Sequence, residues 1–376
     1  MERVGIIGVG FEGFRPAVTD ISTREMMYLA ASKAYADAGV DPRKDIGSFI
    51  CCTEDFWEGW AITDEMVPDQ VGGARRPLCT IAGEGITGIA HAVMHIRSGV
   101  ADVVAVESHS KSADVLDKHA VENLALDPAY LRVQGVNGDV LAGLEMGAFM
   151  EASGFTRGDI NLAVRREKES ALRNPRASYG GTLTEQEIES SDEIASPLRI
   201  HDKAEYAEGG IVVVLAGENW IRKNRREGVF VDGIAWRSTV PWYESGVVGT
   251  ADYASEAFRA AARQAKRASP GSFDLLEVDD TYSYKLLQHL ASMGISRQKA
   301  ISLLKGGRPA LNPSGGAIGC GNLLEASGLH RVLECVLQLR GTAGGCQVHG
   351  AKTAAAFSWR GNPTGTGAAM VMSRGE

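Results

Sequence analysis

The sequence predicts an α/β protein built from two lobes, each of them a sheet covered by helices. The chain has 376 residues, which is more than the roughly 250–300 residues that one hydrophobic core usually serves. Strand-like apolar runs alternate with helix-like segments along it. Residues 81–99 and 312–341 each lead from a glycine-containing loop into an apolar helix that ends in arginine and glycine. This similarity between the two segments indicates a weak internal duplication, with one copy in each lobe.

The sequence of the first lobe predicts alternating strands and helices from its start. A helix is predicted after Ser22, because Ser22 and Glu25 stand in the positions of a capping box. Another helix is predicted over 86–99, where apolar residues recur at helical spacing and a glycine closes the run. Strands are predicted at 4–10, 45–53 and 101–107, the last of them a continuous apolar run of the buried kind. This order is typical of a sheet covered on both faces.

Residues 108–197 are charged and irregular, which predicts an excursion out of the first lobe. Strand character returns at 211–216. We therefore assign residues 1–225, with the excursion, to an N-terminal lobe and residues 226–376 to a C-terminal lobe. In the second lobe we expect strands at 230–234, 275–278 and 368–372 and a helix at 254–266.

The composition is that of a soluble globular protein, without a nucleic-acid or membrane partner. The net charge is -8 and the pI is about 5.6, and no stripe of lysine and arginine is dense enough for a nucleic-acid surface. No apolar run approaches the roughly 18 residues of a membrane span, and we see no secretory leader, so we expect a cytoplasmic location. The six cysteines include no CxxC pair, so we expect reduced thiols and no metal site.

The most specific motif is NPSGG at 312–316, which continues to the Ala-Ser-Gly sequence at 326–328. Supporting segments, in this order along the chain, are the helix at 86–99 followed by ADVVAVES at 101–108, the Glu-Gly-Gly before a buried strand at 208–210, and LEVDDTY at 276–282. In these segments and their order the chain resembles the thiolase superfamily over nearly its whole length. Within that superfamily it is most similar to the sterol-carrier-protein-x type.

The resemblance implies a thiolase fold, with two pseudo-symmetric αβαβα lobes that share a central helical layer. In that fold the active site lies where strand ends and helix N-termini converge, and free backbone N–H groups stabilise a thioester oxygen as it becomes an oxyanion or enolate. The candidates for these loops are Gly83, Gly85, Gly315 and Gly316. The resemblance also implies a homodimer and an acyl-CoA substrate, with coenzyme A as part of the substrate and no covalently bound cofactor.

The chain departs from the family's pattern where the covalent chemistry takes place. Ala82 stands where the resemblance places a nucleophilic cysteine, and an alanine cannot hold an acyl group. Asn322 replaces the histidine of a Gly-His-Pro motif, and DDTY at 279–282 replaces a motif that carries an oxyanion donor. The second catalytic cysteine corresponds to a position near 358–361, where the sequence reads SWRG. These replacements are hard to reconcile with an acyl-enzyme mechanism.

Retro-aldol cleavage of a β-hydroxyacyl-CoA accommodates the replacements, because it needs a base and enolate donors but no nucleophile. Certain thiolase-like proteins without the cysteine, which act on steroid side chains, resemble this pattern. Asn322 and the N–H groups of the glycine loops are candidate enolate donors. The candidate bases or acids are Asp279, Asp280, Tyr243, Tyr282 and His349.

Two other functions remain open. In one of them an acyl-CoA acyltransferase or thiolase of the Claisen type uses a relocated thiol. The candidates are Cys79, which lies shortly before Ala82, and Cys320, which lies in the glycine loop. In the other, the chain is a non-catalytic scaffold subunit with a thiolase fold.

Basic side chains suggest how the substrate and its partners are bound. Arg166 and Arg173 lie in the excursion, which usually covers the nucleotide in this fold, and are candidates for the phosphates of coenzyme A. Arg360 is a candidate for a substrate carboxylate. The resemblance also implies a possible small partner protein with an OB fold and a zinc ribbon, and the chain has no zinc motif of its own.

Overall fold

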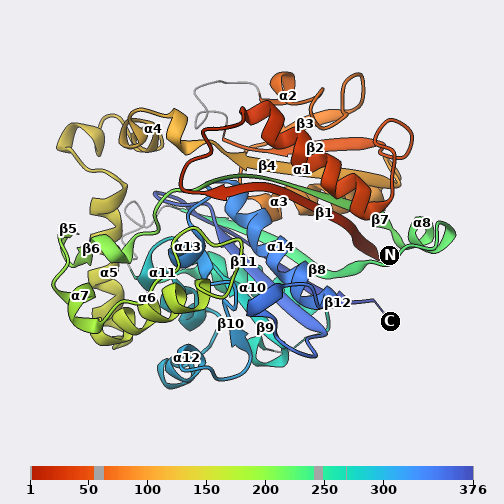
Figure 1. Cartoon of the computed structure of the whole chain (residues 1–376). Coiled ribbons are helices and arrows are strands. Elements are labelled where there is room, and N and C mark those ends of the chain that lie inside the picture. Colours follow the sequence, from red (N-terminus) through yellow and green to blue (C-terminus); the bar gives the residue numbers. More distant parts are fainter. Residues whose placement is uncertain (1, 55–62, 241–248, 268, 376) are drawn as a thin grey trace.

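The computed structural model describes residues 2–54, 63–240, 249–267 and 269–375. In these residues, one mixed sheet of ten strands runs in the order β10-β9-β11-β12-β8-β1-β7-β4-β2-β3 (Figure 1). Its N-terminal half consists of β1 (Val4–Arg15), β2 (Ser48–Cys52), β3 (Leu78–Ile81), β4 (Val103–Ser110) and β7 (Glu208–Gly217). Its C-terminal half consists of β8 (Val229–Thr239), β9 (Leu275–Val278), β10 (Ala310–Leu311), β11 (Thr353–Trp359) and β12 (Gly365–Arg374).

The two halves of the sheet repeat one topology. From the middle outward, the first half runs β1-β7-β4-β2-β3 and the second runs β8-β12-β11-β9-β10. In both halves the three outer strands are parallel and the two inner strands are antiparallel to their neighbours. A short antiparallel pairing of β1 with β8 joins the halves. The repeat confirms the internal duplication predicted from the sequence.

Two helices, α3 (Gly85–Arg97) and α14 (Ala326–Arg340), form a central layer between the halves (Figure 1). Their apolar side chains, such as Ile89 and Leu333, pack with inward-facing residues of both halves in one core cluster. Helix α1 (Thr23–Ala38) covers the outer face of the first half. Helices α10 (Asp252–Gln264), α11 (Ser283–Ser292) and α12 (Arg297–Leu304) cover the second half. The layers therefore follow the predicted order α, β, α, β, α.

The first strand and helix show why glycine recurs in the opening apolar run. Ser22 accepts a hydrogen bond from the Glu25 N–H at 3.2 Å, and Glu25 accepts one from the Ser22 N–H at 2.9 Å, so the predicted capping box is confirmed. A Cβ at Gly10 would lie 2.1 Å from the carbonyl oxygen of Ala30. Glycine in β1 therefore lets α1 approach the sheet closely.

The predicted excursion, which lies between β4 and β7, contains more helix than its irregular sequence indicated. Its elements are α4 (Lys118–Asn123), α5 (Gly138–Ser153), α6 (Arg157–Ala171), α7 (Glu185–Glu189) and the hairpin of β5 (Glu193–Ala195) with β6 (Leu198–Arg199). Charged residues on α6 obscure its periodicity, but Ile160 and Ala163 turn inward and pack with the core of the C-terminal half. The lobe boundary at residues 225 and 226 stays a prediction, and it falls between α8 (Glu218–Lys223) and β8.

Candidate active site

A cavity, which we call the main cavity, lies where the N-terminus of α3 meets the segments that follow β9 and β11. Its polar wall residues include Glu84, Lys203, Tyr206, Tyr282, Asn322 and Arg360. A second cavity is lined by Ala82 and Gly83, among others, and it shares Glu84 and Arg360 with the main cavity. Strand ends and a helix N-terminus therefore converge on two cavities that share wall residues.

The return path of the excursion is fixed to the loops of the C-terminal half. The Ala204 N–H donates to the carbonyl oxygen of Thr281 at 2.9 Å, and the Ala207 N–H donates to that of Asn322 at 2.9 Å. The backbone of Lys203 also bridges to that of Tyr282. These bonds bring side chains from distant parts of the chain into one cavity wall.

Tyr282 and Asp139 form a hydrogen-bonded pair at the main cavity. The phenol of Tyr282 donates to Asp139 Oδ1 at 3.2 Å, and Lys203 Nζ lies 2.8 Å from the same oxygen. Asp139 lies in the first turn of α5, where the helix dipole favours a negative charge. Burial, and then the charge of Asp139, raises the pKa of Tyr282 well above its usual range. The phenol is therefore protonated at neutral pH and donates its hydrogen bond to Asp139.

A second tyrosine–carboxylate pair lies in the same wall. Tyr206 donates a short hydrogen bond to Glu122 Oε1. Burial and the negative charge of Glu122 raise the pKa of Tyr206. The ammonium of Lys203 lies 5.9 Å from the centre of the Tyr206 ring, so one cation serves both pairs.

Glu84 is a buried residue in the wall of both cavities. It directly precedes α3 and is 7% exposed. The hydroxyl of Ser358 donates to Glu84 Oε2 at 2.5 Å. Burial raises the pKa of Glu84 to about 8, against the opposing charge of Arg331. Glu84 is thus a neutral acid over most of the physiological range.

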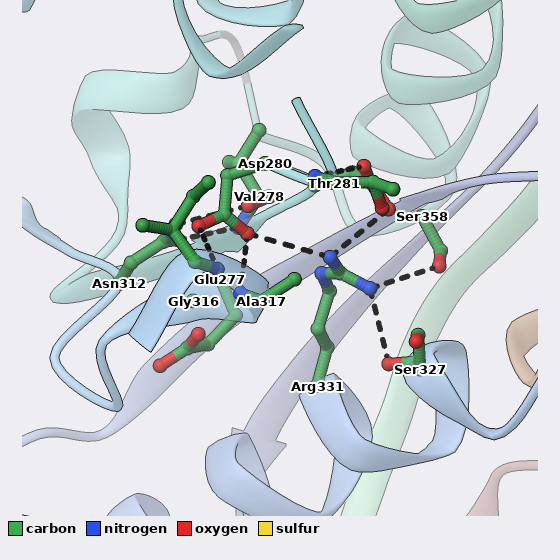
Figure 2. A network of polar contacts seen from close by, with 12 residues as sticks. Glu277, Val278, Asp280, Thr281, Asn312, Gly316, Ala317, Ser327, Arg331 and Ser358 are labelled. Atoms are coloured by element: carbon green, nitrogen blue, oxygen red, sulfur yellow. Dashed lines mark hydrogen bonds and ion pairs between the residues drawn. The ribbon is translucent and has the colours of Figure 1, made fainter. Parts of the chain in front are cut away.

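Asp279 and Asp280, predicted as candidate bases or acids, are ion-paired with Arg331 in the core, and Figure 2 shows Asp280 beside Arg331. Arg331 Nη2 lies 2.9 Å from Asp279 Oδ2 and 3.6 Å from Asp280 Oδ1. Asp280 also accepts hydrogen bonds from the N–H groups of Ala317 and Ile318, at 2.6 and 3.1 Å. Burial raises the pKa of Asp280 to about 6, although Arg331 opposes the shift. Neither aspartate lines the main or the second cavity, so the structure gives both a supporting position behind the site.

The glycine loops serve mainly close packing. Gly316 has φ +58°, and a Cβ there would lie 2.1 Å from Asp280 Oδ2. A Cβ at Gly315 would lie 2.6 Å from that of Ala171, and one at Gly85 would lie 2.5 Å from the backbone nitrogen of Leu329. Of the four predicted glycines, only Gly83 lies in the wall of either cavity. A role of the others in binding the thioester stays a prediction.

The two candidate thiols lie outside both cavity walls. Cys320 is 3% exposed and its Sγ donates to the carbonyl oxygen of Ser314 at 3.2 Å. Burial, followed by the charge of Glu334, raises the pKa of the Cys320 thiol well above its ordinary value. A nucleophilic cysteine needs a lowered pKa. Cys79 lies on β3, half-buried against the core between the halves.

Two predicted residues of the main cavity already have partners. Asn322 Oδ1 accepts hydrogen bonds from the Leu324 N–H at 2.9 Å and the Ser327 hydroxyl at 3.3 Å. The amide orientation is thereby fixed, and the amide Nδ2 can serve as a donor. Arg360 donates from Nε and Nη2 to the two oxygens of Glu54, at 2.5 and 2.7 Å. A substrate carboxylate would have to compete with Glu54 for Arg360.

The remaining predicted residues are not brought to the main cavity. Arg166 donates to the carbonyl oxygen of Asn312 at 2.8 Å and so supports the glycine loop. Arg173 and His349 are exposed and lie outside both cavity walls. Tyr243 lies outside the described residues. In the part of the chain that the structure describes, no group of three His, Cys, Asp or Glu side chains could hold a metal ion, and no helix could cross a membrane.

The sequence predictions missed most of the acid–base groups at the site. Tyr206, Glu122, Asp139 and Lys203 all lie in the excursion or its return path, where no local pattern marks them. Glu84 did leave a signal, because a carboxylate between two glycines directly precedes a buried helix. Its importance depends on burial, which that local pattern does not reveal.

Comparisons with known proteins agree with this architecture. Residues 244–374 match the family model "Thiolase C-terminal domain-like". An acetyl-CoA acetyltransferase of Methanothermobacter thermautotrophicus is 28% identical over 390 aligned positions, which cover 100% of each chain. This similarity extends across both lobes.

Solved structures show the same fold at low sequence identity. The Ltp2-ChsH2(DUF35) aldolase superposes with a TM-score of 0.83 at 20% identity, covering 99% of this chain and 98% of that one. A monomeric SCP2-thiolase like protein type 1 from Mycobacterium smegmatis superposes with a TM-score of 0.74 at 16% identity, covering 99% and 77%. The fold predicted from the motifs is confirmed.

Proposed function

Because the chain is a member of the thiolase superfamily, we propose that it cleaves a carbon–carbon bond beside an acyl-CoA thioester without forming an acyl-enzyme. The proposed reaction is retro-aldol cleavage of a β-hydroxyacyl-CoA to an acyl-CoA and a carbonyl compound. Coenzyme A would enter as part of the substrate. The reverse reaction would join the same two products.

One observation carries this proposal: the main cavity has acid–base groups but no thiol in its described wall. Tyr282, hydrogen-bonded to Asp139, and Glu84 provide sites that accept and hold protons. Ala82 provides only a methyl group at the tip of α3. Such a site can run proton-transfer chemistry, whereas covalent acyl transfer needs a nucleophile in the same place.

The Tyr282–Asp139 pair supplies the base of the proposed mechanism. As the phenol oxygen of Tyr282 takes the proton of the β-hydroxyl group, its own proton passes to Asp139. The oxygen then forms a carbonyl, the Cα–Cβ bond breaks, and its electron pair becomes a thioester enolate. The Asn322 amide donates to the enolate oxygen, and Lys203, whose Nζ lies 2.8 Å from Asp139 Oδ1, orients that carboxyl group. No step requires a cysteine.

Side-by-side assays test the proposal. The purified chain, and any complex that it forms with a partner, is incubated with a panel of β-hydroxyacyl-CoA esters, and separately with β-ketoacyl-CoA esters plus coenzyme A. We expect release of an acyl-CoA and a carbonyl compound from the first panel. Thiolysis of the second panel without cleavage of the first would contradict the proposal.

A Claisen acyltransferase is the second candidate, because a relative is an acetyl-CoA acetyltransferase. It would need a reactive thiol, and a double substitution tests this. The Cys79→Ala/Cys320→Ala variant should keep its turnover within about twofold, because the raised pKa of Cys320 leaves little thiolate at neutral pH. Rapid inactivation of the native chain by iodoacetamide, absent in the double variant, would favour the acyltransferase.

The assembly in which the reaction occurs is also a proposal. The structural neighbour with a TM-score of 0.83 is an aldolase that contains a DUF35 partner. We propose a homodimer that can recruit a small OB-fold and zinc-ribbon protein. If neither the chain nor such a complex bound CoA esters or formed products, a non-catalytic scaffold role would be favoured instead.

A further inference from the structure

We propose that Glu84 is the general acid of the reaction, which gives its proton to the α-carbon of the thioester enolate. The inference rests on the proposed retro-aldol function for its substrate. It adds a second activity, because the same carboxyl group should exchange the α-hydrogens of a bare acyl-CoA with solvent. Neither the motifs nor the comparisons assign this role to Glu84.

The position of Glu84 suits a residue that donates a proton to a reacting carbon atom of the substrate. Glu84 lies in the wall of both cavities, which share only Glu84 and Arg360 among their described wall residues. Tyr282 lines the main cavity on the side of the excursion, whereas Glu84 enters from the loop before α3. A substrate bound between them would have Tyr282 on one side and Glu84 on the other. This arrangement suits the proposed reaction, in which the base acts on the β-hydroxyl group and the acid acts on the α-carbon.

The surroundings hold Glu84 in one place. The Ser358 hydroxyl donates to Oε2 at 2.5 Å. A Cβ at residue 328 would lie 2.1 Å from that same oxygen, so only glycine in the first turn of α14 leaves room for it. Glu84 occupies the N-cap position of α3, and a backbone hydrogen bond from Gly85 lowers the pKa of its carboxyl group. The side chain is therefore positioned by Ser358, by Gly85 and by the space that Gly328 leaves.

Each proton that moves in the proposed reaction has a donor and an acceptor among Tyr282, Asp139, Glu84, the substrate and solvent. The β-hydroxyl proton reaches Asp139 through Tyr282, and the electrons of the Cα–Cβ bond form the enolate. The O–H bond of Glu84 then breaks as a new C–H bond forms at the α-carbon, which leaves a Glu84 carboxylate. Solvent returns a proton to Glu84 and removes one from Asp139. No oxidant, metal ion or additional reactant enters.

The charge state of Glu84 favours this direction at neutral pH. Its pKa is raised to about 8, chiefly by burial, so the acid form dominates below that pH. The charged or titratable groups around it are Arg331 on α14, Asp279 after β9, Arg360 after β11, His91 on α3, Glu325 before α14 and Cys52 on β2. Cleavage should therefore fall as pH rises through about 8, whereas α-hydrogen exchange, which needs the carboxylate, should rise over the same interval.

The experiment measures both activities in the full-length chain. Deuterium exchange at the α-carbon of acetyl-CoA in D2O is followed by mass spectrometry, and cleavage of a β-hydroxyacyl-CoA is followed by product release. Glu84→Gln should lower both rates about 10²-fold, the usual contribution of one general acid or base. It should also remove the pH dependence near 8, because glutamine can donate a hydrogen bond but cannot transfer a proton.

Two further variants separate catalysis from structure. Ser358→Ala should move the pH dependence to higher pH, because the hydrogen bond from Ser358 lowers the pKa of Glu84. Glu277→Gln is the matched control, since the pKa of Glu277 is also raised to about 8 by burial, while its carboxylate binds Ser314 and lies outside both cavity walls. The control should keep the pH dependence of the native chain.

The outcomes distinguish the two proposals. If the chain cleaves its substrate and Glu84→Gln cleaves it with unchanged rate and pH dependence, Glu84 is not the acid but the retro-aldol function stands. If exchange depends on Glu84 and no β-hydroxyacyl-CoA is cleaved, the acid stands and the retro-aldol function fails. A chain with neither activity overturns both.

Discussion

Replacement of Arg331 by methionine is expected to lower the free energy of unfolding by about 3–5 kcal/mol, because it leaves buried carboxylates without their cation. Arg331, Asp279 and Asp280 are each at most 3% exposed. Removing one member of such a group imposes the desolvation cost of the charges that remain. Methionine preserves much of the side-chain volume, so the loss reports charge more than packing.

The loss in the free energy of unfolding caused by Arg331→Met should increase with pH. In the native chain burial raises the pKa of Asp280 to about 6, and Arg331 opposes that shift. Without Arg331 the folded-state pKa rises further above the unfolded value, so the carboxyl group protonates in acid and the charge cost disappears. Above the folded pKa the carboxylate is ionised and buried. Chemical denaturation at pH 5 and pH 8 should show the larger loss at pH 8.

Arg340 offers a matched control on the same helix. It also pairs with an aspartate, at 2.6 Å from Asp37, but the two side chains are 24% and 40% exposed. An ion pair at the surface contributes about 0–1 kcal/mol, so Arg340→Met should change stability little. If both variants lost the same free energy of unfolding, the effect of Arg331→Met would not come from the buried charges around Asp280.

The largest effect on activity is expected at Tyr282. Tyr282→Phe should lower kcat by about 10²–10⁴-fold, the range usual for the loss of a group that transfers a proton in the transition state. The ring and its packing against Trp359 would be kept, and only the hydroxyl that reaches Asp139 would be lost. KM should change little, because the hydroxyl acts mainly in the transition state. Steady-state kinetics of β-hydroxyacyl-CoA cleavage measure the effect.

Tyr284→Phe makes the same chemical change two residues further along the chain. The Tyr284 hydroxyl donates to Glu145 at 2.8 Å, deep in the core, and lies outside both cavity walls. This control should lose some stability but keep its kcat within a few-fold. If both variants lost activity equally, the effect of Tyr282 would be structural and the proposed base would have to be sought elsewhere.

The relatives point toward two chemistries, which differ in their need for a thiol. One relative is an acetyl-CoA acetyltransferase, and the structural neighbour with a TM-score of 0.83 is an aldolase. The resemblance to thiolases places the acyl-carrying cysteine at the position of Ala82, just before α3, and alanine has no nucleophile. The described site keeps proton donors and acceptors in its place, which supports the aldolase-type reaction.

The sequence by itself determined the fold and one chemical fact about the site. Alternating strand and helix patterns and the glycine motifs are local, so they can be read without coordinates. The identity of Ala82 is equally direct, because no arrangement of the chain can give an alanine a thiol. The similarity between residues 81–99 and 312–341 predicted two duplicated halves. In the structure, the two halves of the sheet have the same strand order.

Only the tertiary structure decided which acids and bases line the candidate site. Asp279 and Asp280 read as candidate bases, yet Arg331, some 50 residues later in the sequence, draws both into the core. Tyr282 finds its partner Asp139 across a separation of 143 residues. Glu84 owes its raised pKa to burial by surrounding elements. Charge states depend on burial and on partners from distant segments, and a local sequence pattern carries neither.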